Sequence, residues 1–393
     1  MPERTEVLIV GGGIIGLMIA REAAAAGMAV RLLDRGEPGG EASSASAGML
    51  AAQLEAEGPG PLLTLGLQSR ALWSSVGDAI EAESGVGAGR RDEGILALAR
   101  DEAEARHLER RCALQREAGL EVARLDAEEV VRLEPALAAA AIRLALHLPH
   151  DVSYDSRLLL RALRIAAGRA GARITAGAPV HRLLERNGAV GGALAGAERI
   201  EADAVVIAAG AWSGDIAAPG APPLPMHPVR GQIVCLDPAE PPFRHMLATE
   251  RCYLVPRRDG RILVGSTMER AGFDRRVTAG AVARLAAAAI DLVPVLEDAT
   301  VDSAWAGLRP STADGLPAIG PGPRPGLYYA CGHLRSGILL APITARVIVR
   351  LLRGEAPGID LTPFDPRRFA AARPAGEGAA APTSRSGSSF PAV

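Results

Sequence analysis

The chain has 393 residues, and 48% of them are hydrophobic, which is enough for a core shared by two domains. Its 43 basic and 45 acidic residues leave a net charge of −2, so there is no electrostatic case for binding nucleic acid. Every basic residue is arginine. The lack of lysine excludes Schiff-base chemistry and a phosphate-binding loop of the Walker A type.

The cysteines and histidines give no pattern of a metal site or a disulfide framework. The four cysteines never form a C-x-x-C pair, so we expect no zinc site and a reducing, cytoplasmic location. His147 and His150 are close in sequence, but such a pair is more typical of a loop than of metal ligands. We expect no signal peptide, because no basic stretch precedes the first apolar run, and no membrane segment, because glycine or charge interrupts every long apolar stretch.

The first forty residues predict a strand, a glycine turn, a helix and a second strand. An apolar run at 7–10 is followed by three glycines, and helix-compatible sequence then continues to Gly27. A second apolar run covers 29–33 and ends at Asp34. This order is typical of the βαβ unit that binds dinucleotides.

Gly11, Gly13 and Gly16 fit the pattern G-x-G-x-x-G. In that pattern the glycines permit a tight turn, a close approach to a pyrophosphate and close packing of the helix on the strand. The start of the helix offers N–H groups and a partial positive charge to phosphates. Asp34 lies 23 residues after Gly11, where an acid accepts ribose hydroxyls and repels a 2′-phosphate, so we expect FAD or NAD. The alternative is a glycine-rich turn without a ligand.

Alternating elements are predicted after Asp34. A loop of small residues is expected at 36–48, helices at 63–83, 101–119, 125–133 and 156–171, and strands at 94–99 and 172–174. A hairpin turning at Asn187-Gly188 and a buried strand from 203 to 210 follow.

From Met226 onward the pattern predicts a separate sheet rather than a continuation of the parallel one. Strands are expected at 231–236, 251–257 and 261–266, with a hairpin turn at Asp259-Gly260. A helix at 279–293, strands at 305–310 and 327–331, and a last helix at 338–353 complete the predicted fold. Residues 371–393 are mostly Ala, Gly, Pro and Ser, so we expect a disordered tail.

Five segments carry a resemblance to a known family. They read LIVGGGIIG at 8–16, SSASAGML at 43–50, CYLVPRRDGRILVGSTM at 252–268, WAGLRPSTADGLPAIG at 305–320 and GHLRSGILLAP at 332–342. In this order they resemble the D-amino-acid-oxidase-like family of FAD enzymes, and within it the glycine oxidases. The resemblance implies an α/β fold with a discontinuous, Rossmann-like FAD-binding domain at 1–85, 152–224 and 307–370. It also implies a substrate domain with a mostly antiparallel sheet at 86–151 and 225–306.

The resemblance implies which residues contact the substrate. Arg309 would bind the substrate carboxylate, because a guanidinium matches two carboxylate oxygens, and Tyr253 would direct its hydroxyl to the same group. Met49 and Met268 would form an apolar wall near the flavin, and Arg335 would border the substrate entrance. The ordinary alternatives are a surface arginine, a core tyrosine, core methionines and, for Arg335, a structural salt bridge.

The resemblance also implies the residues that hold FAD. The last helix would begin at the pyrimidine edge of the flavin, where its N–H groups and dipole stabilise negative charge. No cysteine lies between Ala304 and Ala330, so we expect FAD to be bound non-covalently. The implied FAD contacts are Gly11, Gly13, Ile14, Ile15, Gly16, Asp34, Arg35, Ala42, Ser43, Ala47, Gly48, Met49, Val180, Gly210, His333, Leu334, Arg335, Ser336, Gly337, Ile338 and Leu339.

The reaction implied by the family is oxidative deamination of glycine, sarcosine or small D-amino acids. The amine is oxidised to an imine, water hydrolyses the imine, and O2 reoxidises the flavin and becomes H2O2. No side-chain base is needed if the amine binds neutral with its α-carbon near flavin N5. The family further implies a role in making the thiazole of thiamine, and a homotetramer.

Two departures from the family pattern leave alternatives open. Arg251 and Ser336 stand where a histidine and an asparagine are expected, which puts the exact substrate in doubt. The alternatives are an FAD-dependent amine or 2-hydroxy-acid dehydrogenase that uses another electron acceptor, and a flavin-binding protein without turnover.

Overall fold

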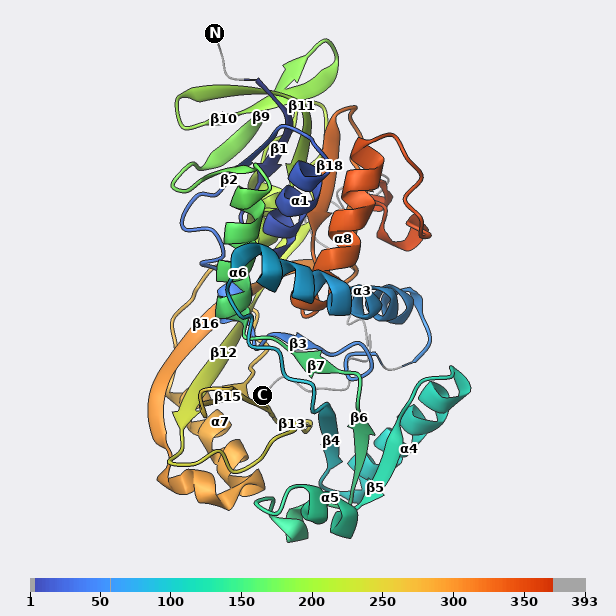
Figure 1. Cartoon of the computed structure of the whole chain (residues 1–393), viewed down its shortest axis with the longest axis vertical. Helices are drawn as coiled ribbons and strands as arrows, with labels where there is room; N and C mark the ends of the chain where they lie inside the picture. Colours follow the sequence, from blue (N-terminus) through green and yellow to red (C-terminus); the bar gives the residue numbers. More distant parts are fainter. Residues whose placement is uncertain (1–3, 57, 370–393) are drawn as a thin grey trace, which may run out of the picture.

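The computed structural model describes residues 4–56 and 58–369. The tail expected at 371–393 therefore lies outside the described residues. The described chain forms two lobes, each built on an eight-stranded sheet, and Figure 1 shows one lobe above the other. A small two-stranded sheet lies where the lobes meet.

The first sheet is mainly parallel and belongs to the upper lobe. Its order is β17-β18-β11-β1-β2-β8, and the β9–β10 hairpin extends it from β11. The pairs β18–β11, β11–β1, β1–β2 and β2–β8 are all parallel. The strands are β1 (Arg4–Val10), β2 (Val30–Leu33), β8 (Arg173–Thr175), β9 (Val180–Arg186), β10 (Ala189–Ala195), β11 (Glu198–Ile207), β17 (Ala318–Pro321) and β18 (Leu327–Cys331).

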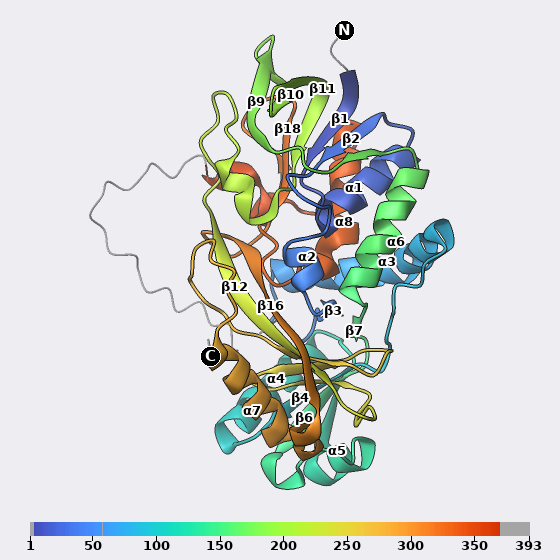
Figure 2. The same cartoon turned by 90° about the vertical axis from the view of Figure 1, so that its left-hand side faces the viewer.

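Helices α1 (Ile14–Ala25), α6 (Ser156–Arg169) and α8 (Gly337–Leu352) cover one face of this sheet, and α3 (Pro61–Ser84) packs across α6 and α8, as Figures 1 and 2 show. α1 is buried on nearly all sides because it lies between the sheet, α6 and α8, and its residues are mostly Ile, Leu, Met and Ala. Short 3-10 turns complete the lobe at η2 (Gly210–Asp215), η4 (Thr362–Phe364) and η5 (Pro366–Phe369).

The second sheet is mainly antiparallel and forms the lower lobe. Its order is β16-β12-β15-β14-β13-β4-β6-β5, and only β13–β4 is parallel. Its strands are β4 (Ile95–Ala99), β5 (Ala123–Asp126), β6 (Leu144–Leu148), β12 (Met226–Asp237), β13 (Met246–Ala248), β14 (Tyr253–Pro256), β15 (Ile262–Gly265) and β16 (Thr300–Thr312). Its helices are α4 (Glu102–Glu117), α5 (Ala127–Leu133) and α7 (Ala279–Leu292), with 3-10 turns η1 (Ala139–Ala141) and η3 (Pro294–Asp298).

The two lobes are joined by strands that serve both. β12 and β16 pair from Met226↔Thr312 to Asp237↔Thr300 and run from the lower sheet up to the first lobe (Figure 2). Nearby, β3 (Met49–Leu50) pairs with β7 (Val152–Ser153). The expected division between 306 and 307 falls inside β16, so the discontinuous domain boundaries stay a proposal.

Most of the predicted helices and strands are confirmed, but several short elements were not predicted. The expected loop at 36–48 contains the short helix α2 (Ala42–Ala45), which packs against α6 and β16. Leu125, expected in a helix, lies on β5 opposite Ala145, and His147, expected in a loop, lies on β6. β5, β6, β13 and β17 were missed because the identity of a short strand depends on the neighbour with which it pairs.

One arginine of the lower lobe is buried against the backbone of the upper lobe. Arg257, only 6% exposed, follows β14. Its Nη1 donates to the carbonyl oxygen of Tyr154 at 2.9 Å, and its Nη2 donates to that of Ala47 at 3.0 Å. A buried carbonyl oxygen without a hydrogen-bond donor is unfavourable, because it has lost its contact with water. The two hydrogen bonds of Arg257 therefore stabilise the contact between the lobes beside β3 and β7.

We expect Arg257→Met to lower the free energy of unfolding by about 1–3 kcal/mol, because two buried carbonyl oxygens lose their donor. The neighbouring Arg258 is exposed and donates to the carbonyl oxygen of Arg90. Arg258→Met is the matched control and should change stability by less than about 0.5 kcal/mol. Thermal or urea unfolding measures both, and equal losses in the two variants would contradict the proposed tie.

Candidate active site

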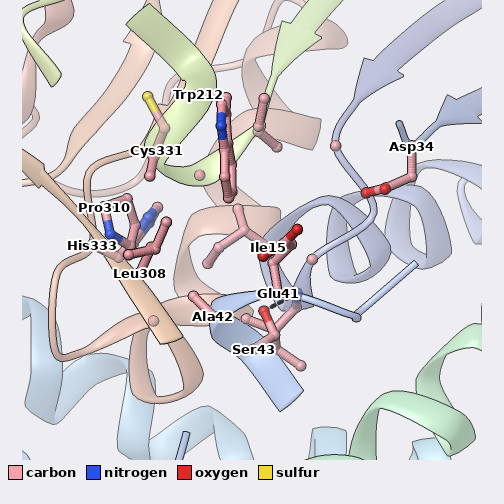
Figure 3. A pocket seen from close by; sticks show the side chains of 18 of the residues that line it. Ile15, Asp34, Glu41, Ala42, Ser43, Trp212, Leu308, Pro310, Cys331 and His333 are labelled. Carbon is pink, nitrogen blue, oxygen red and sulfur yellow. Dashed lines mark hydrogen bonds between the residues drawn. The ribbon is translucent and has the colours of Figure 1, made fainter. Parts of the chain in front are cut away.

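A deep cavity of about 270 Å3 opens where the parallel strands of the first sheet end. Its walls come from the carboxyl ends of β1, β2, β11 and β18, from α2, and from the middle of β12 and β16. Figure 3 shows that it is elongated, with Asp34 at one end, His333 at the other, and Ile15 and Trp212 between them. Ligands of open α/β sheets bind at this edge, beside the strand at which the order reverses, which here is β1.

The glycine turn after β1 holds the start of α1 close to the strands. Gly11 has φ +109°, and a Cβ there would lie 2.4 Å from the carbonyl oxygen of Ala208 on the neighbouring strand connection. A Cβ on Gly16 would lie 1.9 Å from the carbonyl oxygen of Gly11. Gly16 does not line the cavity. Because it has no side chain, it lets the helix approach the turn closely.

Polar groups at the start of α1 are arranged around Asp34 and Ser43. One oxygen of Asp34 accepts from the backbone N–H of Gly12 at 2.7 Å, and the other accepts from Gly36 at 2.8 Å. The Ser43 hydroxyl accepts from the N–H of Ile14, the first residue of α1, at 3.0 Å. The Asp34 carboxylate is therefore fixed at the cavity wall, where a ribose would meet it.

Trp212 also lines the cavity and was not predicted. The Arg35 guanidinium lies 3.4 Å from the centre of the Trp212 ring, and Phe273 of the lower lobe stacks with it at 5.3 Å between ring centroids. Glu41 pairs with both Arg35 and Arg275, each at 2.8 Å. Both lobes thus contribute to the cover of the cavity. The only signal in the sequence is that a rare aromatic follows the buried strand and Gly210.

A smaller cavity of about 70 Å3 continues from the deep one. The two share Ser46, Arg309, Arg335 and Ile338, so they form one connected site. Met49 and Tyr253 line the smaller cavity, and so does Glu55, which was not predicted. The small volume suits a ligand of a few heavy atoms.

Arg309 lies on β16 at the junction of the two cavities. Its Nη1 donates to the carbonyl oxygen of Thr267 at 3.0 Å, and its Nη2 donates to the Ser266 hydroxyl at 2.5 Å. In the described part of the chain it forms no ion pair with an acidic side chain. Burial lowers the pKa of the Arg309 guanidinium, Tyr253 opposes this change, and the group still remains charged at neutral pH. A partly buried cation without an acid favours binding of an anion.

Two glycines provide the space that Arg309 and Tyr253 occupy. A Cβ on Gly231 would lie 2.1 Å from Nη1 of Arg309, and a Cβ on Gly265 would lie 2.5 Å from the Tyr253 hydroxyl oxygen. Only glycine at these positions lets the two side chains lie flat on the strands. Sequence reasoning did not identify this role, because the pairing of β12 with β16 and of β14 with β15 had to be known first.

Arg335 pairs with Glu55 across the small cavity. Its Nε lies 2.5 Å from one oxygen of Glu55, and its Nη2 donates to the other at 2.9 Å. Arg335 thus forms a structural salt bridge and also lines both cavities, so both interpretations of this residue from the sequence agree with its position. Met268, with Arg251, lines another small cavity, which shares Tyr253, Ser266 and Arg335 with the one around Arg309.

Among the described residues at the junction of the cavities, none has a basic side chain suited to proton abstraction. His333 lines the deep cavity and its Nε2 lies 3.0 Å from the hydroxyl of Thr344. Burial lowers the pKa of His333 to about 3, so the imidazole is neutral and a weak base. Among residues 4–56 and 58–369, no cluster of His, Cys, Asp and Glu could hold a metal ion, and no helix is long and apolar enough to span a bilayer.

The residues implied as FAD contacts largely meet in the two connected cavities. Only Gly16 lies behind the wall, as described above. The deep cavity is lined by Gly11, Gly13, Ile14, Ile15, Asp34, Arg35, Ala42, Ser43, Val180, Gly210, His333, Leu334, Arg335, Gly337 and Ile338. The smaller one is lined by Ala47, Gly48, Met49, Ser336 and Leu339, and it shares Arg335 and Ile338 with the first. Their individual roles stay predictions.

The cavity fits the group that the resemblance implies. Backbone at Gly11 and Gly13 is bare, and the first residues of α1 and α8 both line the wall, so two helix N-termini face the same space. Such termini stabilise phosphates and developing negative charge. The Asp34 carboxylate completes a site for an adenosine with a free ribose.

Comparison with known proteins decides the family. The family of FAD dependent oxidoreductases called DAO matches residues 6–351. The chain belongs to this family. It is therefore an FAD-dependent oxidoreductase with the Rossmann-like α/β fold that the sequence predicted, and FAD is its cofactor.

Relatives within the DAO family cover almost the whole chain. A glycine oxidase from Geobacillus kaustophilus is 38% identical over 93% of this chain and 97% of its own. The crystal structure of glycine oxidase from that organism matches with a TM-score of 0.89 at 37% identity, over 92% of this chain and 98% of its own. The bifunctional protein ThiO/ThiG of Synechocystis sp. is 37% identical, and the match covers 94% of this chain but 55% of that longer protein.

A further solved DAO-family structure has a different named substrate. Iminodiacetate oxidase from Chelativorans sp. BNC1 matches with a TM-score of 0.82 at 29% identity, over 92% of this chain and 99% of its own. The family and fold are thus shown, whereas the substrate has to be argued from the site.

We expect the bound FAD to be released by acid, although one thiol lines the cavity. Cys331 directly follows the cysteine-free segment 304–330 and borders the cavity (Figure 3). Burial raises the pKa of the Cys331 thiol to about 12, so little reactive thiolate exists at neutral pH. Acid precipitation should leave a yellow supernatant and a colourless pellet, and a yellow pellet would contradict non-covalent binding.

Proposed function

We propose that the protein oxidises glycine, and also sarcosine and small D-amino acids, with O2 as electron acceptor and H2O2 as product. The observation that carries this proposal is Arg309, a cation without an acidic partner at the mouth of a cavity of about 70 Å3. A cavity of this size beside the cofactor space suits a small carboxylate. The name of the Geobacillus kaustophilus relative, a glycine oxidase, supports the same substrate class.

The side chains of the small cavity would bind and orient the substrate. Arg309 would bind the carboxylate through both guanidinium nitrogens that face it, and the Tyr253 hydroxyl would donate to the same carboxylate. Met49 and Leu339 provide apolar walls beside these polar groups. Fixing the carboxylate in this way fixes the α-carbon toward the deep cavity, where FAD supplies the acceptor of the hydride.

The amine would need no side-chain base. His333 is neutral and a weak base, as described above, and the Glu55 carboxylate is already engaged by Arg335. The substrate would therefore lose its proton to solvent before it binds and react as the neutral amine. The first residues of α8 would stabilise the negative charge that arrives in the deep cavity.

The charge of the cavity favours one carboxylate over two. An amine with two carboxylates, such as the substrate named for the Chelativorans relative, would need a second available cation. Among the described residues that line the small cavity, the one other arginine is Arg335, and Glu55 balances its charge. We therefore prefer a monocarboxylic amine.

Three wider proposals follow from the family resemblance. The product would serve thiazole formation in thiamine synthesis, which the ThiO/ThiG relatives support. The protein would act in the cytoplasm as a homotetramer, and the five-part division into FAD-binding and substrate domains would hold. Each of these stays a proposal.

We expect glycine and sarcosine to bleach the flavin absorption of the purified holoprotein under anaerobic conditions. Air should then restore the absorption with formation of one H2O2 per turnover. Bleaching without peroxide would instead support a dehydrogenase that uses another acceptor. A holoprotein that neither glycine, sarcosine nor D-alanine reduces would contradict the proposed function.

We expect Gly231→Ala to raise the KM for glycine about 10- to 100-fold, because the new methyl group displaces the Arg309 guanidinium without removing its charge. Gly168→Ala is the matched control: Gly168 lies in α6, and a Cβ there meets nothing within 4 Å. Unfolding and FAD absorption show whether each variant folds. An unchanged KM in folded Gly231→Ala would contradict the role of Arg309.

A further inference from the structure

The Glu55–Arg335 ion pair is part of the wall of the substrate cavity. Both side chains are largely buried, with 16% of Glu55 and 18% of Arg335 exposed. Both line the same small cavity as Arg309 and Tyr253. A pair in this position affects any ligand that Arg309 binds, because charges interact strongly where water is excluded.

The charged side chains that line the small cavity sum to one positive charge, which one anionic group would neutralise. Arg309 and Arg335 contribute two positive charges, and Glu55 contributes one negative charge. Glu55 contacts Arg335 through both of its oxygens, whereas it acts on Arg309 only through space, where it raises the pKa of that guanidinium. The remaining single positive charge matches one substrate carboxylate.

A buried polar network holds the segment that carries Glu55. The fully buried Asp151 carboxylate accepts from the backbone N–H groups of Gln53 and Leu54 at 3.0 and 2.8 Å, and from Nη1 of Arg70 at 2.6 Å. Arg111 donates to the carbonyl oxygens of Gln53 and Leu54 at 3.0 and 2.6 Å. Because the two residues before Glu55 are held from both sides, its carboxylate cannot move far from Arg335.

We propose that Glu55 determines specificity: it balances Arg335 so that the site accepts amines with one carboxylate and rejects those with a second. This inference rests on the proposed function. A second carboxylate on the amine nitrogen would extend toward Arg335 and meet the fixed Glu55 carboxylate. Placing like charges together lowers affinity, and a built-in repulsion of this kind excludes the wrong ligand.

Two non-oxidisable ethers test the proposal with the holoprotein. Methoxyacetate has the shape of sarcosine with an ether oxygen in place of the amine, and diglycolate adds the second carboxylate. The shift of the FAD absorption bands on titration gives each Kd. In the unaltered protein, methoxyacetate should bind at least about tenfold more tightly than diglycolate, because only diglycolate brings a second carboxylate to Glu55.

Glu55→Gln should abolish this preference. The variant keeps the shape of the side chain but leaves the Arg335 charge without its acidic partner, so diglycolate should gain at least about tenfold relative to methoxyacetate. N-carboxymethylglycine should then be oxidised faster relative to sarcosine by a similar factor. The matched control is Glu83→Gln, which removes the acid of another two-contact arginine pair, with Arg21, outside both cavities. It should leave the ratio of the two affinities unchanged.

The outcomes separate this inference from the proposed function. If the unaltered protein binds methoxyacetate and oxidises sarcosine but does not discriminate against diglycolate, the specificity role of Glu55 is wrong and the proposed function stands. The same holds if folded Glu55→Gln keeps the original preference. It also holds if this variant loses sarcosine oxidation while methoxyacetate still binds, because Glu55 would then interact with the substrate amine. If the unaltered protein neither binds methoxyacetate nor oxidises sarcosine, both proposals are wrong.

Discussion

The site depends on the middle of the β12–β16 pair, where the two lobes meet. Gly231 and Gly307 lie directly opposite each other in this pair, and both line the deep cavity. A Cβ on Gly231 would occupy the place of the Arg309 guanidinium, and a Cβ on Gly307 would lie 2.6 Å from Cβ of Ala45 on α2. The lobes can therefore approach closely and still leave a cavity between them, because the strands that join them lack side chains at this point.

The charges of the site follow from the same arrangement. β16 brings Arg309 to the junction of the cavities, and the turn after β18 brings Arg335 to the same cavities. Glu55 balances Arg335, and within residues 4–56 and 58–369 the hydrogen bonds of Arg309 go to the neutral Thr267 carbonyl and Ser266 hydroxyl. A fixed, partly dehydrated cation of this kind binds an anion without reorganisation of its surroundings. The chemistry of the site thus rests more on positioned charge than on proton transfer by a side chain.

Much of the first lobe could be predicted from the sequence because its signals are local. The glycine turn, the apolar strands around it and Asp34 occur within forty residues, and the structure has the strand, helix and strand that they predict. The five family segments likewise placed Arg309 and Arg335, which lie at the connected cavities. Glu55, Trp212 and Gly231 were missed because their importance comes from residues far away in the chain. Glu55 meets Arg335 across 280 positions, and Gly231 matters only once β12 pairs with β16.

The stacking of Trp212 on Phe273 couples the binding of the dinucleotide to the contact between the two lobes. One ring belongs to the upper lobe and the other to the lower, and the first also forms part of the wall around the cofactor. Anything that separates the lobes would thus uncover the dinucleotide, and a bound dinucleotide would in turn oppose their separation. FAD would then stabilise the folded protein as well as serve its reaction, because a ligand that binds only the closed form stabilises that form by mass action.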